Sequence, residues 1–323
     1  MSVEIHVTDY GVSLAIGNTT NDLMLACMAD LPVLTPDSNL LLSSTEHEES
    51  HHPVLLRHSY NSAILMEEAC LALKDKASNS SLTLLLLPSE SDPQYPEIKA
   101  SLKSMMGAPE IEAVPPHQLQ KHLEAALTSL QQGDIELLTV FGLDSMAGTA
   151  VMSDWLEQGK LRTQLNPDGR AVGEGFGWFT LSRREPNEQQ PTIRWHSGEC
   201  TSEPNDRGNG SREYHGLALS LQPLLQYIGK EPDTWVYSRR QTPEDDLEAL
   251  MAFQYHWGNT KQKQLEQLCP ARKTGDLGAA ALPVAVALAC ERLAFERYKK
   301  SSALVSDSHP DGRHFSLLLS KDV

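Results

Sequence analysis

The sequence predicts an α/β protein built from layers of strands and helices. Two patterns support this fold class: short apolar runs bounded by Gly, Pro or Ser, typical of buried strands, and segments with apolar residues at helical spacing between them. The composition is a third support, since 40% hydrophobic residues in a chain of 323 are enough for a substantial core. We therefore expect one large domain or two modest ones in which strands and helices alternate.

The first part of the chain alternates strand and helix from its start. Its predicted helices cover residues 21–29, 61–76 and 117–132, and the last of them ends at Gly133. Its predicted strands cover residues 3–5, 13–16, 82–87, 110–114, 135–141 and 175–182, with a turn at Tyr10-Gly11 between the first two. Residues 35–53 are rich in Ser, Glu and His, and we expect a mobile loop there.

The second part repeats this alternation after a polar boundary. Residues 183–190 and 203–211 contain Gly, Pro and Asn, and they separate a predicted N-terminal half, residues 1–185, from a predicted C-terminal half, residues 186–323. In the C-terminal half we expect helices at residues 214–228, 245–255 and 279–299, and strands at residues 234–237 and 314–320.

The bulk properties exclude several classes of function. The formal charge of −16 disfavours nucleic acid as a partner, because an acidic surface repels phosphate. No apolar run is long enough to span a membrane, and residues 1–9 do not read as a secretory signal. The five scattered cysteines, odd in number and without a CxxC pair, predict reduced thiols in the cytoplasm and no structural zinc.

Two short motifs suggest chemistry, but their contexts do not fit it. Residues 47–51 (HEESH) match a zinc-protease pattern, which needs a buried helix, whereas their flanks are polar. Residues 173–177 (GEGFG) lead into a predicted strand, whereas a phosphate-binding loop opens a helix. We therefore expect no metal and no cofactor. The glycines should allow close backbone packing, and Glu174 should be a buried, hydrogen-bonded structural residue.

Isolated cysteines and histidines give no catalytic assignment either. Cys70 and Cys290 lie on apolar helices, where a cysteine usually serves as a small hydrophobic residue. His215 and His256 lie on helices without a cysteine or carboxylate at a matching spacing. An enzyme that pairs a serine or cysteine with His256 is one function class that these residues leave open.

Several segments, taken in their order along the chain, resemble the β-ketoacyl synthases. The similar segments are residues 3–18 (VEIHVTDYGVSLAIGN), 57–87, 135–146 (IELLTVFGLDSM), 166–181 (NPDGRAVGEGFGWFTL), 242–250 (TPEDDLEAL), 273–282 (KTGDLGAAAL) and 312–319 (GRHFSLLL). The resemblance covers nearly the whole chain. It implies a thiolase-like five-layer αβαβα sandwich of two related βαβαβ halves, and a dimer in which strand 110–114 pairs with its twin.

The resemblance also implies which residues should be catalytic, and this chain lacks them. The family uses a cysteine at a helix N-terminus, where the helix dipole lowers the thiol pKa, together with two histidines or a histidine and an asparagine. Counting back from Gly133 places Pro116 at the cysteine position. The first histidine position falls near Tyr237 or Ser238, and Asp276 stands at the second. Lys273 corresponds to a lysine of some relatives.

This loss predicts a pseudoenzyme that works as a cytoplasmic binding protein. Short ketosynthase-like proteins that resemble this chain accompany type VI secretion modules, which implies a role in loading or assembling a secreted effector through an adaptor. The alternative is an inactive, chain-length-factor-like partner of a ketosynthase in fatty acid or polyketide (aryl polyene) synthesis. Either function implies a homodimer or a heterodimer of thiolase-like subunits.

Overall fold

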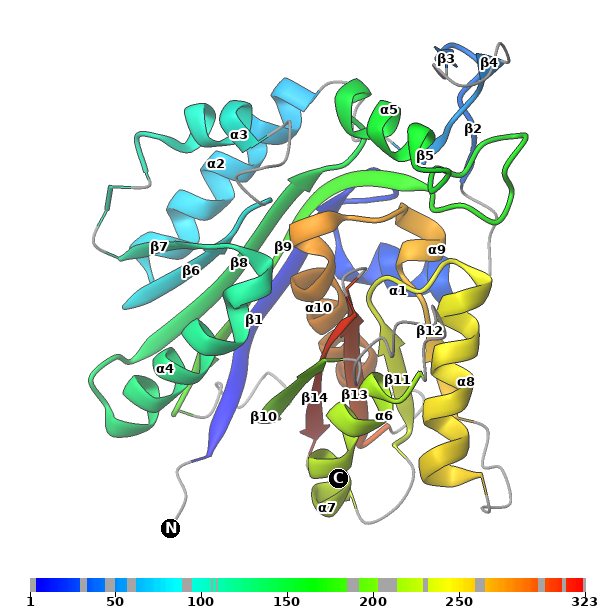
Figure 1. Ribbon diagram of the computed structural model, residues 1–323. Helices are drawn as coiled ribbons and strands as arrows, with labels where there is room; N and C mark the ends of the chain where they lie inside the picture. The colour runs from blue at the N-terminus through cyan, green and yellow to red at the C-terminus, as the bar shows by residue number, and fades with distance from the viewer. Residues whose placement is uncertain are drawn as a thin grey trace.

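Figure 1 shows the computed structural model of the chain, which describes residues 4–29, 34–43, 50–56, 62–88, 95–105, 107–108, 110–184, 192–202, 214–228, 232–258, 265–295, 300–309 and 312–321. The strands are β1 (Ile5–Leu14), β2 (Thr35–Pro36), β3 (Leu42–Ser43), β4 (Ser50–His51), β5 (Val54–Leu56), β6 (Leu82–Leu86), β7 (Ile111–Val114), β8 (Leu137–Ser145), β9 (Val172–Ser182), β10 (Ile193–Ser202), β11 (Thr234–Tyr237), β12 (Glu266–Leu268), β13 (Ser302–Ser308) and β14 (Arg313–Lys321). The α-helices are α1 (Thr20–Met28), α2 (Ser62–Ser78), α3 (Tyr95–Leu102), α4 (Leu119–Gln132), α5 (Thr149–Glu157), α6 (Gly216–Leu221), α7 (Leu225–Ile228), α8 (Pro243–Trp257), α9 (Ala271–Thr274) and α10 (Ala281–Ala294). Three 3-10 turns cover Pro116–Gln118, Gln222–Leu224 and Gly278–Ala280.

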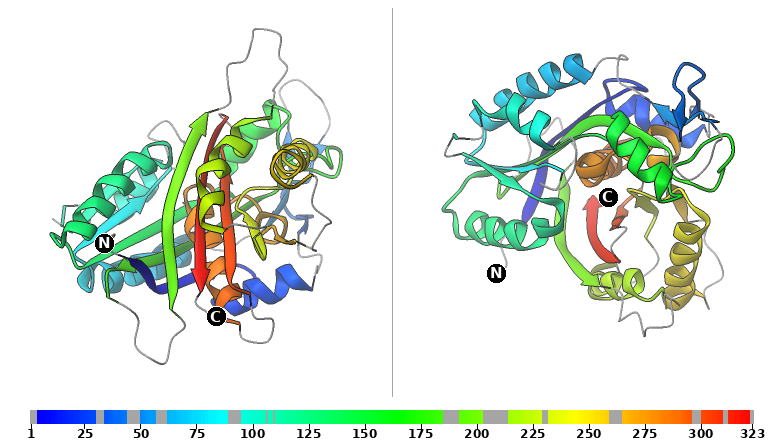
Figure 2. Two further views of the ribbon diagram at one scale, coloured as in Figure 1. Left: turned by 90° about the horizontal axis from the view of Figure 1, so that it is seen from below. Right: turned by 45° about the horizontal axis from the view of Figure 1, so that its top comes forward.

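Most of the described strands form one mixed sheet that bends around a central pair of helices. Its order is β12-β11-β13-β14-β10-β1-β9-β8-β6-β7, and β1 and β10 join its two wings. Helices α4 and α10 lie between the wings, α2 and α3 cover the outer face of one wing, and α6 and α8 cover the outer face of the other (Figures 1 and 2). These five layers confirm the predicted αβαβα sandwich.

The alternation of side chains along the strands divides the core between these layers. In β6, Leu84 and Leu86 face the central layer, whereas Leu85 faces the outer helices. In β13, Val305 faces the central layer and Leu304 the outer one. Because both faces of β6 are covered, this strand is a continuous apolar run, as the sequence indicated.

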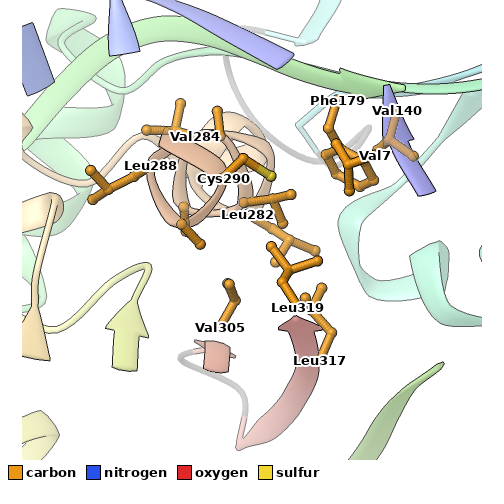
Figure 3. Packing of buried hydrophobic residues seen from close by; sticks show 14 of the residues in the cluster. Val7, Val140, Phe179, Leu282, Val284, Leu288, Cys290, Val305, Leu317 and Leu319 are labelled. Carbon is orange, nitrogen blue, oxygen red and sulfur yellow. The ribbon is translucent and has the colours of Figure 1, made fainter. Parts of the chain in front are cut away.

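Helix α10 is the centre of the molecule. It is apolar on all sides, and its residues from Ala281 to Cys290 are all buried. Figure 3 shows its side chains Leu282, Val284 and Leu288 among Val305 and Leu319 of the neighbouring strands. Along the described parts of the chain, no helix combines the length and apolar character needed to cross a bilayer.

Three expectations about local structure are corrected. Tyr10-Gly11 is not a turn, because β1 continues through both residues. Gly11 pairs with Trp178 on β9, and a Cβ at Gly11 would lie 2.3 Å from the indole ring. Only glycine therefore leaves room for the tryptophan side chain at this position. Part of the predicted loop at residues 35–53 forms the short strands β2, β3 and β4. The predicted helix at residues 214–228 is interrupted by a 3-10 turn at Pro223, which has no N–H to continue the α-helical bonding.

The sequence analysis also missed α3, α5, α9, β5, β10, β12 and β13, and helix α10 ends at Ala294, short of the predicted residue 299. Of the predicted boundary segments, residues 185–190 and 203–211 lie outside the described residues, as do residues 47–49 of the HEESH motif. The division at residue 185 therefore stays a prediction.

Candidate functional site: a closed corner beside helix α4

Residues that the resemblance singled out come from distant parts of the sequence and meet at one corner of the fold. Pro116 opens the 3-10 turn in front of α4 and lines a small cleft of about 40 Å³. Asp307 of β13 lines the same cleft and accepts a hydrogen bond from Ser238. Arg239 then joins Asp307 to Asp276. The structure thus places Pro116, Ser238 and Asp276 around two residues, Arg239 and Asp307, that the sequence analysis did not name.

We call Ser238, Arg239, Asp276 and Asp307 the Arg239 network. Each nitrogen of the guanidinium group donates a hydrogen bond: Nε to Asp307 at 2.7 Å, Nη1 to Asp276 at 3.1 Å, and Nη2 to the carbonyl oxygen of Gly278 at 2.5 Å. Asp276 also accepts from the backbone N–H of Gly278 at 2.9 Å. The two carboxylates are therefore held from several sides in one fixed arrangement.

The network is shielded from water, which decides its electrostatics. Only 6% of Arg239 and 1% of Asp276 are exposed. Burial disfavours the charge on Arg239, but Asp307 and Asp276 outweigh burial and raise the pKa of the guanidinium above its usual value. Burial alone would raise the pKa of Asp307, yet the charges of Arg239 and His309 and the hydrogen bonds from Ser238 and Arg239 lower it below its usual range. Both groups are thus charged at neutral pH, and removal of one leaves the other buried without its partner.

A second set of hydrogen bonds supports the corner from the N-terminal strands. Asp144, at the end of β8, accepts from the N–H of Ala279 at 2.7 Å and from the N–H of Ser145 at 2.8 Å. Ser145 Oγ in turn donates to Glu174 at 2.7 Å. Glu174 is 3% exposed, so the expectation that it is a buried hydrogen-bond acceptor is confirmed.

The glycine-rich segment packs backbone against backbone and does not open a helix. Gly173 donates its N–H to the carbonyl oxygen of Asp276 at 2.9 Å, and a Cβ on Gly173 would lie 1.9 Å from the carbonyl oxygen of Thr274. Gly278 has a φ of +51°, and a Cβ there would lie 1.9 Å from the Asp144 carboxylate. Only glycine allows β9 and the loop around Asp276 to approach this closely.

Tyr237 and Ser238, the two candidates for the first histidine position, face different layers. The Tyr237 ring stacks on Trp235 at 4.5 Å, in the outer layer beneath α6 and α8. Its hydroxyl has no hydrogen-bond partner among the described residues, and burial raises its pKa well above the usual value. Ser238 instead contacts Asp307, so it is Ser238 that belongs to the corner.

The other cysteines and histidines considered from the sequence lie elsewhere. Cys290 is completely buried in the central layer, and burial raises the pKa of its thiol. Cys70 lines a groove between α2 and α3, where burial also raises the thiol pKa. His256 Nε2 lies 2.7 Å from the carbonyl oxygen of Ala218 and links α8 to α6. Neither thiol has the lowered pKa of a nucleophile.

Lys273 and His215 also stay outside the network. Lys273 is buried at the end of α9, and His215 precedes α6, where its ring packs near Tyr255. Among the described residues, no group of three or more His, Cys, Asp and Glu side chains is arranged to hold a metal ion.

The structure shows one further polar cluster beside the corner. Ser308 Oγ lies 3.0 Å from His314 Nδ1, and His314 Nε2 lies 3.5 Å from Glu248. The order serine, histidine, carboxylate resembles a hydrolytic relay. However, His314 and Glu248 are both buried, and their separation exceeds a good hydrogen bond, so we assign this cluster to the linkage of β13, β14 and α8.

Comparisons with known proteins identify the fold of this chain but not its family or its activity. No family model matches the sequence, and no curated protein sequence matches it either. Among solved structures, the ketosynthase from module 6 of the bacillaene synthase of Bacillus subtilis 168 superposes with a TM-score of 0.71 at 12% identity, over 99% of this chain and 72% of that one.

Two further solved structures match this chain over their full length. A type II ketosynthase in complex with its acyl-carrier protein gives a TM-score of 0.73 at 11% identity, over 99% of this chain and 100% of that one. The ishigamide ketosynthase/chain length factor gives 0.67 at 14% identity, again over 99% and 100%. At such identities the likeness concerns architecture alone, and the chain has the thiolase-like fold of the ketosynthases.

Proposed function

We propose that this chain is a ketosynthase-fold subunit that performs no condensation and acts by binding another protein. The observation that carries the proposal is the Arg239 network. It occupies the corner where the resemblance places the two histidines, next to Pro116 at the position of the nucleophile.

The chemistry of these side chains supports the proposal. Proline has no group that could form a thioester. Asp276 is an acceptor bonded to a guanidinium, whereas the polarisation of a thioester carbonyl requires a hydrogen-bond donor at that place. A carboxylate there would also repel the enolate that decarboxylation of a malonyl group produces.

The partner that fits best is another ketosynthase-fold subunit. One of the similar structures is a ketosynthase/chain length factor, and the present chain covers all of it. This favours the chain-length-factor-like function, in which an inactive subunit pairs with an active one. A role in type VI secretion rests on the sequence resemblance and stays a prediction.

The first experiment measures decarboxylation of a malonyl thioester by the purified chain. We expect no turnover above background. Turnover that disappears in Asp276→Asn or Arg239→Lys would contradict the proposal, since it would show that the network itself does chemistry.

The second experiment identifies the partner by co-purification from the native cell. A ketosynthase and an acyl-carrier protein would support the chain-length-factor-like function, whereas adaptor or spike proteins would support effector assembly. Deletion of the gene then separates them by phenotype: a missing polyketide or altered fatty acids in the first case, and lost effector delivery with normal lipids in the second.

A further inference from the structure

A small cavity lies in the outer layer, between the sheet and the helices α6 and α8. Tyr237 of β11, Glu248 of α8 and Ser308 of β13 line it, together with Arg239 and Arg240. Its volume is about 10 Å³. A cavity must offer about 10–15 Å³ to hold one water molecule, so this one has room for a single water molecule and for no larger ligand.

The hydroxyl group of Tyr237 has no hydrogen-bond partner within the described chain, although only 4% of the residue is exposed. The ring is held in the outer layer, because it stacks on Trp235 at 4.5 Å and the Arg240 guanidinium lies 4.9 Å from its centre. An unpaired buried hydroxyl is costly, and the large majority of buried polar atoms in proteins have a partner. We therefore expect a partner that is not part of the chain.

Tyr237 and Glu248 approach each other at this cavity. Burial is the main reason why the pKa of the Tyr237 hydroxyl is raised well above its usual value, and the negative charge of Glu248 adds to this shift, although Arg240 opposes it. The hydroxyl and the carboxylate are therefore within electrostatic reach of each other, yet the hydroxyl forms no direct hydrogen bond. A bridging water molecule is the usual link between two buried polar groups that are close but do not touch.

Charges of both signs line the cavity, and together they favour a neutral ligand. Arg239 and Arg240 would repel a cation, whereas Asp245 and Glu248 would repel an anion. A water molecule can accept a hydrogen bond from one group while it donates to another. The carboxylate of Glu248 offers about four acceptor positions, and the hydroxyl of Ser308 can accept as well as donate, so both can bond to water in addition to His314.

We infer that the cavity binds one ordered water molecule, which accepts a hydrogen bond from the Tyr237 hydroxyl and donates to the Glu248 carboxylate and to Ser308 Oγ. Three hydrogen bonds are about what a buried water molecule makes in proteins. The water joins the end of β11 to α8 and β13, beside the Arg239 network. This inference goes beyond the proposed function and does not depend on it, because it concerns a ligand of the fold.

The first test uses the sign of a stability change in the full chain. Tyr237→Phe removes the hydroxyl and keeps the ring. If the hydroxyl donates to a water molecule, the variant loses that hydrogen bond, and we expect the midpoint of urea unfolding to fall. If the hydroxyl is unpaired, its removal relieves a desolvated group, and a midpoint that stays or rises would overturn the inference. Tyr255→Phe is the matched control: Tyr255 is 61% exposed on α8, and its loss of a hydroxyl should leave the midpoint unchanged.

The second test locates the ligand in crystals of the full chain, at a resolution that shows ordered water. We expect one peak of density within about 2.5–3.0 Å of both Tyr237 Oη and the Glu248 carboxylate, and a weaker peak in Tyr237→Phe. An empty cavity, or a hydroxyl bonded directly to a protein group, would overturn the inference. Crystals soaked in bromide distinguish water from an anion, since an anomalous signal in the cavity would show that an anion binds there and would also overturn it.

Discussion

Replacement of Arg239 by methionine tests the Arg239 network most directly. Methionine has a similar volume but no charge and no donor, so Asp276 and Asp307 lose the guanidinium that pairs them. Removal of one partner from a buried ion pair costs about 3–5 kcal/mol. Since the whole free energy of unfolding of a domain is about 5–15 kcal/mol, Arg239→Met should be close to the limit of what the fold tolerates.

The assay is urea unfolding followed by tryptophan fluorescence at pH 7. Arg184→Met is the matched control, because Arg184 lies 3.3 Å from Glu136 in an ion pair on the surface, which should contribute less than about 1 kcal/mol. The triple variant Arg239→Met, Asp276→Asn, Asp307→Asn should recover part of the loss, because its buried groups are neutral. If Arg239→Met is no more destabilising than Arg184→Met, the reasoning about this corner is wrong.

The stability difference between wild type and Arg239→Met should also depend on pH, and the pKa of Asp307 gives the direction of this dependence. The pKa of Asp307 is lowered in the folded protein, so its stabilising effect is fully present above the unfolded pKa of about 3.9 and is lost as the pH falls through the folded value. In Arg239→Met, Asp276 and Asp307 are buried without the guanidinium, and burial without a partner raises the pKa of a carboxyl. The difference in stability between wild type and Arg239→Met should therefore be largest at about pH 8 and should shrink as the pH falls and these carboxyls are protonated.

Four further predictions concern single features. Glu174→Ala removes the acceptor of the Ser145 hydroxyl and should lower stability by about 1–3 kcal/mol in urea unfolding; an unchanged stability with loss of a binding activity would indicate a functional role instead. Gly173→Ala should lower the melting temperature, because its Cβ would meet the Thr274 carbonyl, whereas Gly107→Ala, which meets nothing, should not. Burial lowers the pKa of His256, so its contribution is present above the unfolded pKa of about 6.5 and is lost as the pH falls below it; His256→Gln should flatten the loss of stability between pH 7 and 5. Sedimentation should show a dimer at micromolar concentration, since β7 is an open sheet edge in the single chain, and a stable monomer would contradict pairing at β7.

The layered fold could be predicted from the sequence because its strands are buried on both faces. Continuous apolar runs such as residues 82–87 and 234–237 identify buried strands without knowledge of their partners. Helix α8 could also be predicted, because Thr242 and Asp245 have the spacing of a capping box, which the structure contains at the start of the helix. Strand β13 was missed, because serines at 302, 306 and 308 and Asp307 interrupt its apolar pattern. Ser302, Ser306 and Asp307 accept hydrogen bonds from residues far away in the sequence, which the local pattern does not show.

The site was predictable only in part, for a related reason. Counting back from Gly133 placed the expected cysteine position at Pro116, and the expected first histidine position fell before Thr242, at Tyr237 or Ser238. That these are the catalytic positions of the family stays a prediction. The Arg239 network was not predictable. Arg239 precedes another arginine, Arg240, that bonds to Asp246 and lies over the Tyr237 ring, and nothing local distinguishes the two. Only the tertiary structure shows that one of them is buried between two aspartates.

The charged residues of the Arg239 network lie where several strands and one loop meet. Arg239 links β13, through Asp307, to the loop that carries Asp276 and Gly278, and that loop is bonded to β8 and β9 through Asp144 and Gly173. Each contact joins parts of the backbone, and each polar atom named here is engaged with another residue of the chain. The Arg239 network therefore ties β13 of one wing of the sheet to β8 and β9 of the other through buried, charged hydrogen bonds. We therefore expect substitutions in the Arg239 network to change stability, because each leaves a buried charge without its partner.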